Sequence, residues 1–506
     1  MNNLLRINNI TKKSMIFYCC GILLAVMLGI SSFSLIGRYL VLIFLFVSLI
    51  LPFLAKDKLT VLLWLIFLII ISPEKLYPYF TFKGYVLNSI YGIKLLNIGL
   101  IHIILIMSLS LTLFLTFFHS YRKKYFAFYN FFIYLSLILI MFYVGLIYQN
   151  NMYSILYDEG CFIYFLIFSF ASTIFIERRK IDKDLSIKQL FYFIIFMLQL
   201  RSISALIIDL IYPYLGAAIY DTYLIYLNIV VILIPFISHW LFEREGSSYR
   251  FFSLIASLCA IVEIIFRPER KIFILFTIFL LLFLFGVLYN LKISKDSKLR
   301  DFYKNLNKKL KFFITLIILF FYLFLNLQIS NPIIGGARYK FLTSFFFTSL
   351  AKNNPSIDLR KYEFVNIWNT LCETPFAFLF GYGAGAFFSF KYITPPTSYF
   401  GIGSYGQSQI LSDSFQPHDV INFIFLKSGI LGFILYSLFY LLFLKESFFC
   451  FKKSKGISEM LLFIIIFSSV PIFFTMGYFS ISIACLSGVF YAFLILKYKS
   501  LKEEAK

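Results

Sequence analysis

The sequence predicts an all-α, polytopic integral membrane protein, and three observations support this fold class. Apolar residues make up 61% of the chain, aromatic residues 21% and charged residues 14%, with a mean hydropathy of +0.87. This composition leaves too little polar surface to cover a soluble globule of 506 residues. Apolar stretches of helix length recur along the chain, and short clusters of lysine and arginine separate them.

The apolar stretches define the expected membrane helices. A helix that crosses roughly 30 Å of hydrocarbon needs about 17 to 25 residues. Because several stretches are short, we expect about 12–14 helices by this criterion. No small-residue cleavage site follows the first stretch, so we expect a retained helix and not a signal peptide. In chain order the stretches are 15–34, 38–55, 58–72, 95–118, 125–148, 161–176, 188–212, 222–242, 251–267, 271–290, 311–329, 418–444, 458–476 and 478–497.

The basic clusters predict the orientation of the chain, because lysine and arginine are enriched in cytoplasmic connections. They occur in alternate connections, which places both termini in the cytoplasm. The formal net charge of +22 comes from these clusters, without the continuous basic stripe of a nucleic-acid-binding protein, so we expect no nucleic acid partner. The clusters are Arg6 with Lys12 and Lys13, Lys56 with Lys58, Arg122–Lys124, Arg178–Lys183, residues 292–311, Lys452–Lys455 and residues 497–506.

This orientation divides the chain into three parts. Residues 1–329 hold helices 1–11, residues 330–417 form one large extracytoplasmic loop, and residues 418–506 hold helices 12–14 and a cytoplasmic tail. A loop of this length usually has a function of its own. Helical spacing predicts a surface helix over 356–372, with Ser356 as its N-cap, and a glycine turn follows it. The spaced residues are Tyr362, Val365, Trp368 and Cys372, and the turn contains Gly381, Gly383 and Gly385.

His418 is the histidine best placed for chemistry. It follows Pro417 at the outer start of the helix 418–444, where the positive end of the helix dipole favours a neutral imidazole. A neutral imidazole suits a general base, and a structural interface histidine is the alternative. Asn422, Gly429 and Gly432 share its helical face, and the two glycines would let another helix approach closely.

Other polar residues have structural interpretations. Lys427 lies within a membrane helix, so we expect it to satisfy a polar partner in the bundle. Asp158 and Glu159 are adjacent on an expected outer loop, where an acidic pair is usually solvated. The seven cysteines show no spacing typical of zinc or redox sites. We therefore expect no metal site and no cofactor.

One motif resembles a known family. The run His418-Asp419, nine residues, then Gly429-x-x-Gly432 resembles the signature of the O-antigen ligase and O-antigen polymerase superfamily, in which His is followed by Asn, Ser or Gln, nine residues, Gly, two residues and usually Gly. Here Asp419 stands at the second position. The resemblance covers roughly residues 260–440 and implies a GT-C-like, metal-independent membrane glycosyltransferase. Upstream, Arg360, Trp368, Pro375 and the turn Phe380–Gly383 also resemble the family pattern.

The resemblance implies a reaction at the outer face of a bacterial cytoplasmic (inner) membrane. The donor would be a glycan on undecaprenyl diphosphate, and the acceptor another glycan or the lipid A core. A polymerase that joins repeat units is favoured over an O-antigen ligase, and a lipid-linked oligosaccharide flippase is the alternative from another class. A flippase and a chain-length regulator would be partner proteins, and the lipid bilayer surrounds the chain.

Such a transfer needs cations for the departing diphosphate and a base for the acceptor hydroxyl. Arginine's planar fork suits diphosphate oxygens, and an interfacial contact with lipid headgroups is the alternative for each arginine. Arg267 could instead pair with Glu263, and Arg201 with Asp209. Tyr382 and Trp368 could stack on sugars or pack within the loop. The catalytic candidates are His418, Arg360 and Arg270, and the substrate-binding candidates are Arg338, Arg267, Lys271, Arg201, Tyr382 and Trp368.

Overall fold

A computed structural model of the chain describes the segments that carry most of the expected helices. Apart from a two-residue antiparallel pair, β1 (Lys94–Leu95) with β2 (Ile98–Gly99), every element of the described part is a helix. The expected all-α class is therefore confirmed for this part. The described residues are 21–23, 25–26, 35–71, 94–95, 98–118, 129–178, 183–211, 231, 247–266, 304, 315, 355–395, 417, 419–453 and 481–504.

The first helices follow the predicted stretches closely. They are α2 (Leu35–Leu54), α3 (Leu59–Ile71) and α4 (Leu100–Phe118). The short turn between α2 and α3 satisfies both helix ends. The Lys58 ammonium donates to the carbonyls of Pro52 and Ala55 at 2.7 and 3.0 Å, and the Asp57 carboxylate accepts from the Leu59 N–H at the start of α3.

The middle of the chain forms α5 (Tyr129–Ile147), α6 (Met152–Arg178), α7 (Lys183–Ile211) and α10 (Ser247–Phe266). Helix α6 begins well before residue 161, where the apolar stretch was expected to begin. The expectation that Asp158 and Glu159 lie solvated on a loop was therefore wrong, since both are buried within α6. Hydropathy alone placed the start of the apolar stretch after these carboxylates, because it does not register charges that are paired inside the protein.

The last helices are α14 (Pro355–Leu371), α15 (Pro375–Phe380), α17 (Val420–Lys453) and α19 (Ile481–Glu504). Helix α14 confirms the helix expected in the large loop. It begins at Pro355, as proline's fixed φ favours at a first helical position, so Ser356 lies in the first turn and is not its N-cap. Helix α15 has Thr374 as its N-cap, which accepts from the Ala377 N–H.

Five helices of the described part are long and apolar enough to cross a membrane, as an α-helical membrane protein requires. They comprise segments of α5, α6, α7, α17 and α19, and shorter apolar segments occur in α2, α3, α4 and α10. Most of the expected span 15–34 lies outside the described residues. The same is true of nearly all of 222–242, 271–290, 311–329 and 458–476. The expected number of 12–14 therefore stays a prediction.

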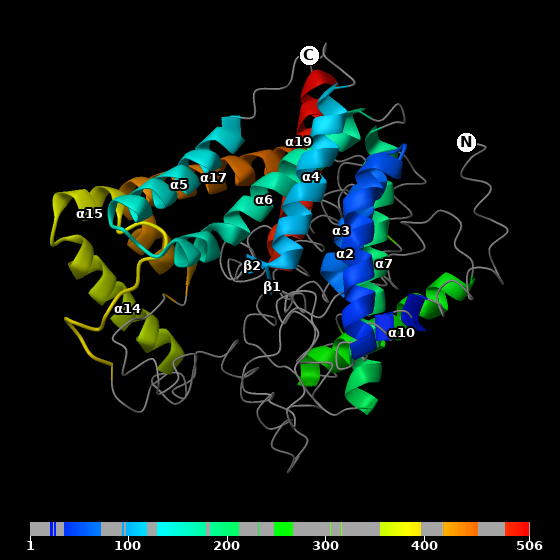
Figure 1. The fold of residues 1–506 in the computed structure, drawn as a ribbon, viewed down its shortest axis with the longest axis horizontal. Coiled ribbons are helices and arrows are strands. Elements are labelled where there is room, and N and C mark those ends of the chain that lie inside the picture. The colour runs from blue at the N-terminus through cyan, green and yellow to red at the C-terminus, as the bar shows by residue number, and fades with distance from the viewer. Residues whose placement is uncertain are drawn as a thin grey trace.

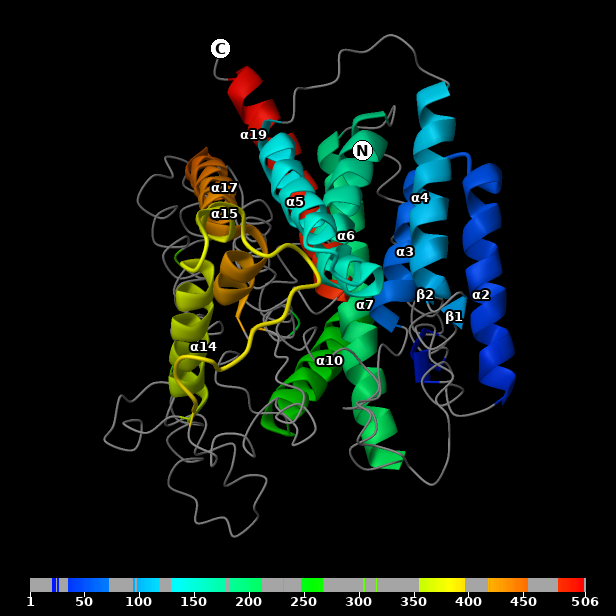
Figure 2. The same cartoon turned by 60° about the vertical axis from the view of Figure 1, so that its left-hand side comes forward.

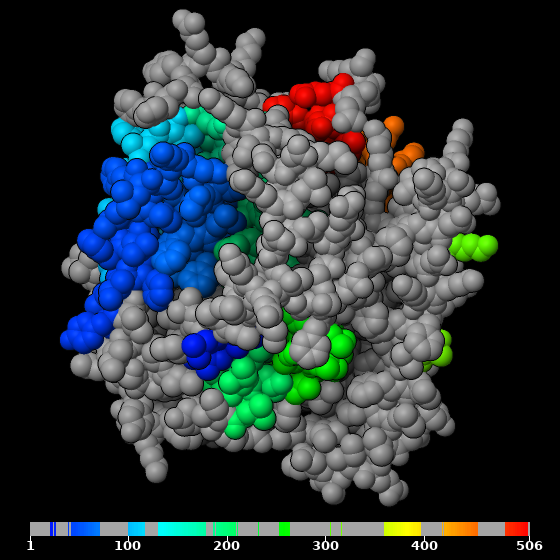
Figure 3. Space-filling view, turned by 90° about the vertical axis from the view of Figure 1, so that its right-hand side faces the viewer, coloured from blue at the N-terminus to red at the C-terminus, as the bar shows by residue number. Residues whose placement is uncertain are grey.

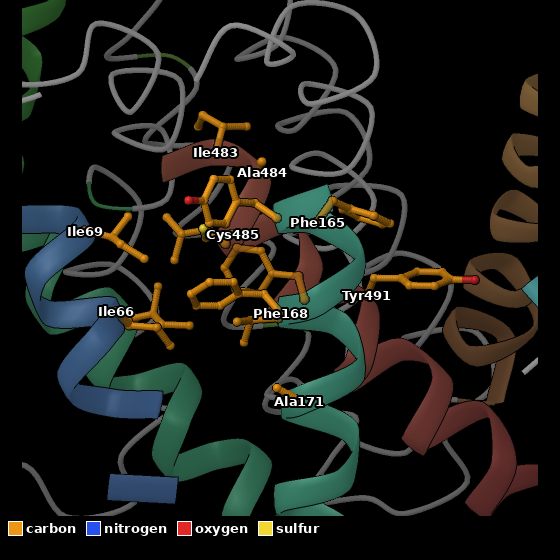
Figure 4. Packing of buried hydrophobic residues seen from close by; sticks show 14 of the residues in the cluster. Ile66, Ile69, Phe165, Phe168, Ala171, Ile483, Ala484, Cys485 and Tyr491 are labelled. Atoms are coloured by element: carbon orange, nitrogen blue, oxygen red, sulfur yellow. The ribbon is translucent and has the colours of Figure 1, made fainter. Parts of the chain in front are cut away.

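The core centres on α6 and α19, which pack against each other and against α3 (Figure 4). Phe165 and Phe168 of α6 are fully buried, as are Tyr491 of α19 and Ile66 of α3. Gly488 permits the close approach of α6 and α19, because a Cβ there would lie 2.6 Å from the Phe165 carbonyl oxygen. Small residues at a helix interface let the backbones approach in this way.

The helices form a broad bundle. In Figure 2, α14, α15 and α17 lie on one side, α5, α6, α7 and α19 in the centre, and α2, α3 and α4 on the other side. Figure 3 shows the face formed by α2 and α3, with α10 beneath them. Exposed apolar side chains of α2, such as Ile43, Phe46 and Phe53, are those that a lipid-facing helix presents.

The ends of α6 and α19 that carry basic clusters lie together. Lys499 of α19 donates to the Glu177 carboxylate of α6 at 3.0 Å. Both ends were predicted to face the cytoplasm, so the structure places them on one common side, as that prediction requires. Following the same orientation, we call the end of α5 and the starts of α6 and α17 their outer ends.

Candidate functional site

Helix α17 is broken at Gly429, whose φ of 60° and ψ of −158° are non-helical. Only glycine adopts such angles without strain. The break frees carbonyl groups of the preceding turn, and the large loop supplies their donors. The Tyr382 N–H donates to the Leu426 carbonyl at 2.8 Å and the Gly383 N–H to the Lys427 carbonyl at 3.0 Å. The predicted continuous stripe from His418 to Gly432 was therefore wrong beyond the break.

The glycine turn, residues 381–386, fits tightly against α17 and α5. Gly381, Gly383 and Gly385 all have positive φ, between 74° and 81°. A Cβ on Gly383 would lie 1.9 Å from the Gly145 N of α5, and one on Gly429 would lie 2.6 Å from the Gly381 N. The close approach expected at Gly429 therefore exists, and the partner is the end of the short helix α15, at Leu379, together with the start of this turn.

A buried ion pair fixes the glycine turn to the bundle. Lys427 of α17 contacts the Asp158 carboxylate of α6 at 2.5 Å, and both side chains are almost completely buried. The same Asp158 oxygen accepts from the Gly385 N–H at 2.6 Å, while the Lys427 ammonium also donates to the Ala386 carbonyl. The expectation that Lys427 has a polar partner within the bundle is confirmed. We call Asp158, Lys427 and the turn residues that they bind the turn lock.

The outer end of α17 has a well-formed N-cap. The Asp419 carboxylate accepts from the Asn422 N–H at 2.8 Å and from the Asn422 side-chain amide at 3.1 Å. Asparagine and serine are the other strong N-cap residues. Asp419 can therefore serve the capping function that Asn or Ser would have at this position of the family signature.

Asn422 links this cap to the loop helix α14. Its side-chain amide is also within 3.3 Å of the Arg360 carbonyl oxygen. The Arg360 guanidinium lies close enough to lower the pKa of Asp419, and Glu363 close enough to raise it. We call Arg360, Glu363, Asp419 and Asn422 the outer-end cluster. The sequence predicted the proximity of Arg360 to this helix start only through the family resemblance.

Arg360 retains unused hydrogen-bonding capacity. Its Nε atom is buried and has no hydrogen-bond partner among the described residues. The ion pairs of the described part do not include Arg360. A buried donor without a partner is costly, and such groups often mark a ligand or water site. The guanidinium could accordingly hold an anion.

Burial governs the electrostatics of Asp419. It raises the pKa of the carboxyl, and the nearby Glu363 carboxyl raises it further. The hydrogen bond from the Asn422 N–H and the charge of Arg360 oppose this shift. Burial and the Glu363 carboxyl therefore disfavour the ionised form of Asp419, and the Arg360 guanidinium partly offsets this effect.

The two aromatic candidates take packing roles. Trp368 stacks on Phe364, with ring centroids 6.0 Å apart, and meets the edge of Phe425. The Tyr382 hydroxyl donates to the Thr370 carbonyl at 3.1 Å and so ties the glycine turn to the end of α14. These contacts favour the alternative of packing within the loop over stacking on a sugar.

Arg201 has a partner on another helix. Its guanidinium contacts the Glu263 carboxylate of α10 at 3.0 and 3.3 Å, with both side chains buried. This contact favours a structural role for Arg201 over diphosphate binding. The Glu263 carboxylate, which was expected to pair with Arg267, is thus bound to Arg201. The side chain of Asp209, the partner that was expected for Arg201, is not described.

Several candidates lie outside the described residues. They are His418, Arg270, Arg338, Arg267 and Lys271. The described residues contain no group of three or more histidine, cysteine, aspartate or glutamate side chains that could hold a metal ion.

No protein-family model, curated protein or solved structure matches the chain. The family resemblance therefore depends on the motif residues alone, and its functional implications are proposals.

Sequence reasoning missed three residues that organise the site. Asn150 donates to the carbonyls of Tyr382 and Ala384, and buried Asn366 binds the backbone of residues 392–393. Asp158 was interpreted as a loop residue. The signal available for Asp158 was Lys427, because a lysine in an apolar helix commonly pairs with a buried acid. No comparable signal identifies the two asparagines, since their partners are backbone groups.

Proposed function

We propose that the chain is a membrane glycosyltransferase that polymerises undecaprenyl-diphosphate-linked oligosaccharide repeat units in O-antigen or related surface polysaccharide biosynthesis. The observation that carries the proposal is the contact between α14 and the start of α17. Through Asn422 this contact brings Arg360, with its unpartnered Nε, beside Asp419. Asp419 directly follows His418 in the sequence, which is why the proposal assigns Arg360 and His418 to one site.

The proposed chemistry assigns one role to each group. His418 accepts the proton of the acceptor hydroxyl as that oxygen attacks the anomeric carbon of the donor sugar. The bond from the anomeric carbon to the diphosphate breaks, with inversion at that carbon, and undecaprenyl diphosphate leaves. Arg360, Arg270 and Arg338 neutralise the departing diphosphate, as bidentate guanidinium groups are suited to do.

Charge balance explains why more than one cation is required. The outer-end cluster places the Asp419 carboxyl beside the Arg360 guanidinium, so this cation already lies near a negative group. A diphosphate would be repelled unless further cations approach it. Arg270, Arg338, Arg267 and Lys271 are the candidates for these additional cations.

The test measures surface polysaccharide on gels from cells in which the gene is deleted and replaced by a variant, with membrane levels of each variant checked. His418→Ala should slow polymer formation by roughly 10²- to 10⁴-fold, the usual contribution of a general base. Arg360→Ala should slow it by about 10²- to 10³-fold. Lys361→Ala is the matched control, because Lys361 is the adjacent, exposed cation on α14, and it should retain polymer.

The polysaccharide pattern distinguishes the candidate functions. A core carrying one repeat unit in the deletion strain and in His418→Ala identifies a polymerase. A bare core with polymer retained on its lipid carrier identifies an O-antigen ligase. Normal polymer with well-expressed His418→Ala and Arg360→Ala contradicts both. Lipid-linked repeat units trapped at the cytoplasmic face of the deletion strain would then support a flippase.

A further inference from the structure

The N–H groups and most of the carbonyl groups of the glycine turn are satisfied from within the protein. All six N–H groups from Gly381 to Ala386 donate to protein acceptors in α15, α17, α5, α6 or the turn itself. The carbonyl groups of Tyr382, Ala384 and Ala386 accept from the side chains of Asn150 and Lys427. A water-exposed loop does not need such complete pairing, whereas irregular backbone at membrane depth does.

The glycine turn also contacts two membrane helices at positions inside their outer ends. The Ala384 N–H donates to the Met141 carbonyl at 2.8 Å, and Met141 lies six residues before the end of α5. Asp158, which binds the Gly385 N–H, lies six residues after the start of α6. At 1.5 Å per residue, both contacts lie roughly 9 Å inside these helix ends.

Helix α15 extends the apolar surface of these helix ends. It lies beside α5 and α17 next to the glycine turn (Figure 1). Phe376 and Leu379 of α15 are 42% and 46% exposed. The centroids of the Phe376 and Tyr148 rings lie 6.1 Å apart. The outer ends of α5 and α6 are themselves rich in exposed tyrosines, which favour the boundary between headgroups and hydrocarbon. These tyrosines are Tyr143, Tyr148, Tyr153 and Tyr157.

Charged residues adjoin the start of α15. Glu373, just before α15, forms an exposed ion pair with Lys391 at 2.8 Å. Charged, exposed side chains thus border the exposed apolar side chains of α15, as in an element at a membrane interface.

We propose that residues 375–387 are not a free extracytoplasmic loop but a segment seated in the outer leaflet, with Phe376 and Leu379 in contact with lipid acyl chains. The occupant is lipid hydrocarbon because the exposed side chains of α15 continue the lipid-facing surface of α5. The turn lock holds the segment at this depth. The inference is independent of the proposed enzymatic activity.

Site-directed spin labelling of the full chain in lipid nanodiscs tests this inference. Nitroxides are attached at Phe376→Cys and Leu379→Cys, in a background with Cys19, Cys20 and Cys372 replaced by serine. Collision with oxygen reports lipid, and collision with a water-soluble nickel chelate reports water. Leu139→Cys, exposed near the middle of α5, is the lipid control, and Lys391→Cys is the water control.

The expected oxygen-to-nickel collision ratio at positions 376 and 379 is near that at 139 and several times that at 391. Asp158→Asn, which weakens the turn lock, should shift the ratio at 379 toward the value at 391. A ratio at 376 and 379 equal to that at 391 in the wild-type background would overturn the proposal and place the segment in water.

Discussion

At the scale of single residues, the turn lock shows how a charge is tolerated in the bundle. Lys427 has 0% exposure and Asp158 has 3%, so each would carry a large desolvation penalty if unpaired. Their contact and the backbone groups of Gly385 and Ala386 offset that penalty. The pair thus joins α6, α17 and the loop at one point.

Removing one partner of the turn lock should therefore lower the free energy of unfolding more than removing both charges. Lys427→Met leaves the Asp158 carboxylate buried without its cation and should lower the free energy of unfolding by roughly 3–5 kcal/mol. Adding Asp158→Asn should restore much of this loss, because the amide oxygen can still accept from the Gly385 N–H. Unfolding in detergent by SDS titration measures the difference. Equal destabilisation by the single and double variants would show that the charges are not coupled.

Asp419 offers a second test, because capping and charge can be separated there. Asp419→Ala removes the N-cap of α17 and should cost about 1 kcal/mol. Asp419→Asn keeps an oxygen for the Asn422 N–H, so it should retain most of the stability. Thermal unfolding of the two variants at pH 7 gives the comparison. A loss of stability as large in Asp419→Asn as in Asp419→Ala would contradict the capping role.

The same position predicts a pH dependence. Burial raises the pKa of the Asp419 carboxyl in the folded state, so the ionised form is disfavoured by folding. This penalty is absent below the ordinary aspartate pKa and complete above the raised value. The stability of wild type relative to Asp419→Asn should therefore decrease as pH rises between these two values. A difference that stays constant across this interval would show that Asp419 does not titrate differently on folding.

At the scale of elements, α17 depends on a break that its sequence only partly reveals. The apolar pattern of residues 420–453 predicts one helix, and Gly429 alone does not distinguish a packing glycine from a broken helix. The distinction comes from the turn at 381–386, which approaches Gly429 from a distant part of the chain. Helix positions were therefore predictable from local hydropathy, while the break, the α15 packing and the burial of Asp158 required long-range contacts.

Glycine-to-alanine variants test the fit between the turn and the bundle. Gly383→Ala would bring a Cβ within 1.9 Å of the Gly145 N at a φ of 78°. The positive φ alone costs about 1–2 kcal/mol, and the backbone clash adds to it, so the turn should separate from α5. Gly160→Ala is the matched control, because a Cβ there meets no atom within 4 Å and helix propensity favours alanine. Thermal unfolding should show a clear loss of stability for Gly383→Ala and none for Gly160→Ala.

At the scale of the whole molecule, composition and charge predicted the class of protein, because lipid solvation acts on every residue of a span. The site was predicted less completely. The resemblance selected Arg360, but the cap at Asp419 and the ties from Asn150 and Asn366 depend on backbone groups that no sequence pattern marks. The membrane orientation of the bundle was predictable to an intermediate extent, since it depends on a statistical rule about basic residues.

That orientation can be tested with one native and one introduced cysteine. Cys372 is exposed in the large loop, which the basic clusters place outside, and Lys499 lies at the opposite, basic end beside Glu177. In cells with the outer barrier removed, a membrane-impermeant maleimide should label Cys372 without permeabilisation. Lys499→Cys, in a background with Cys19, Cys20 and Cys372 replaced by serine, should be labelled only after permeabilisation. Labelling of Lys499→Cys in intact cells would reverse the orientation and place the outer-end cluster on the cytoplasmic face, where a transfer reaction at the outer surface is excluded.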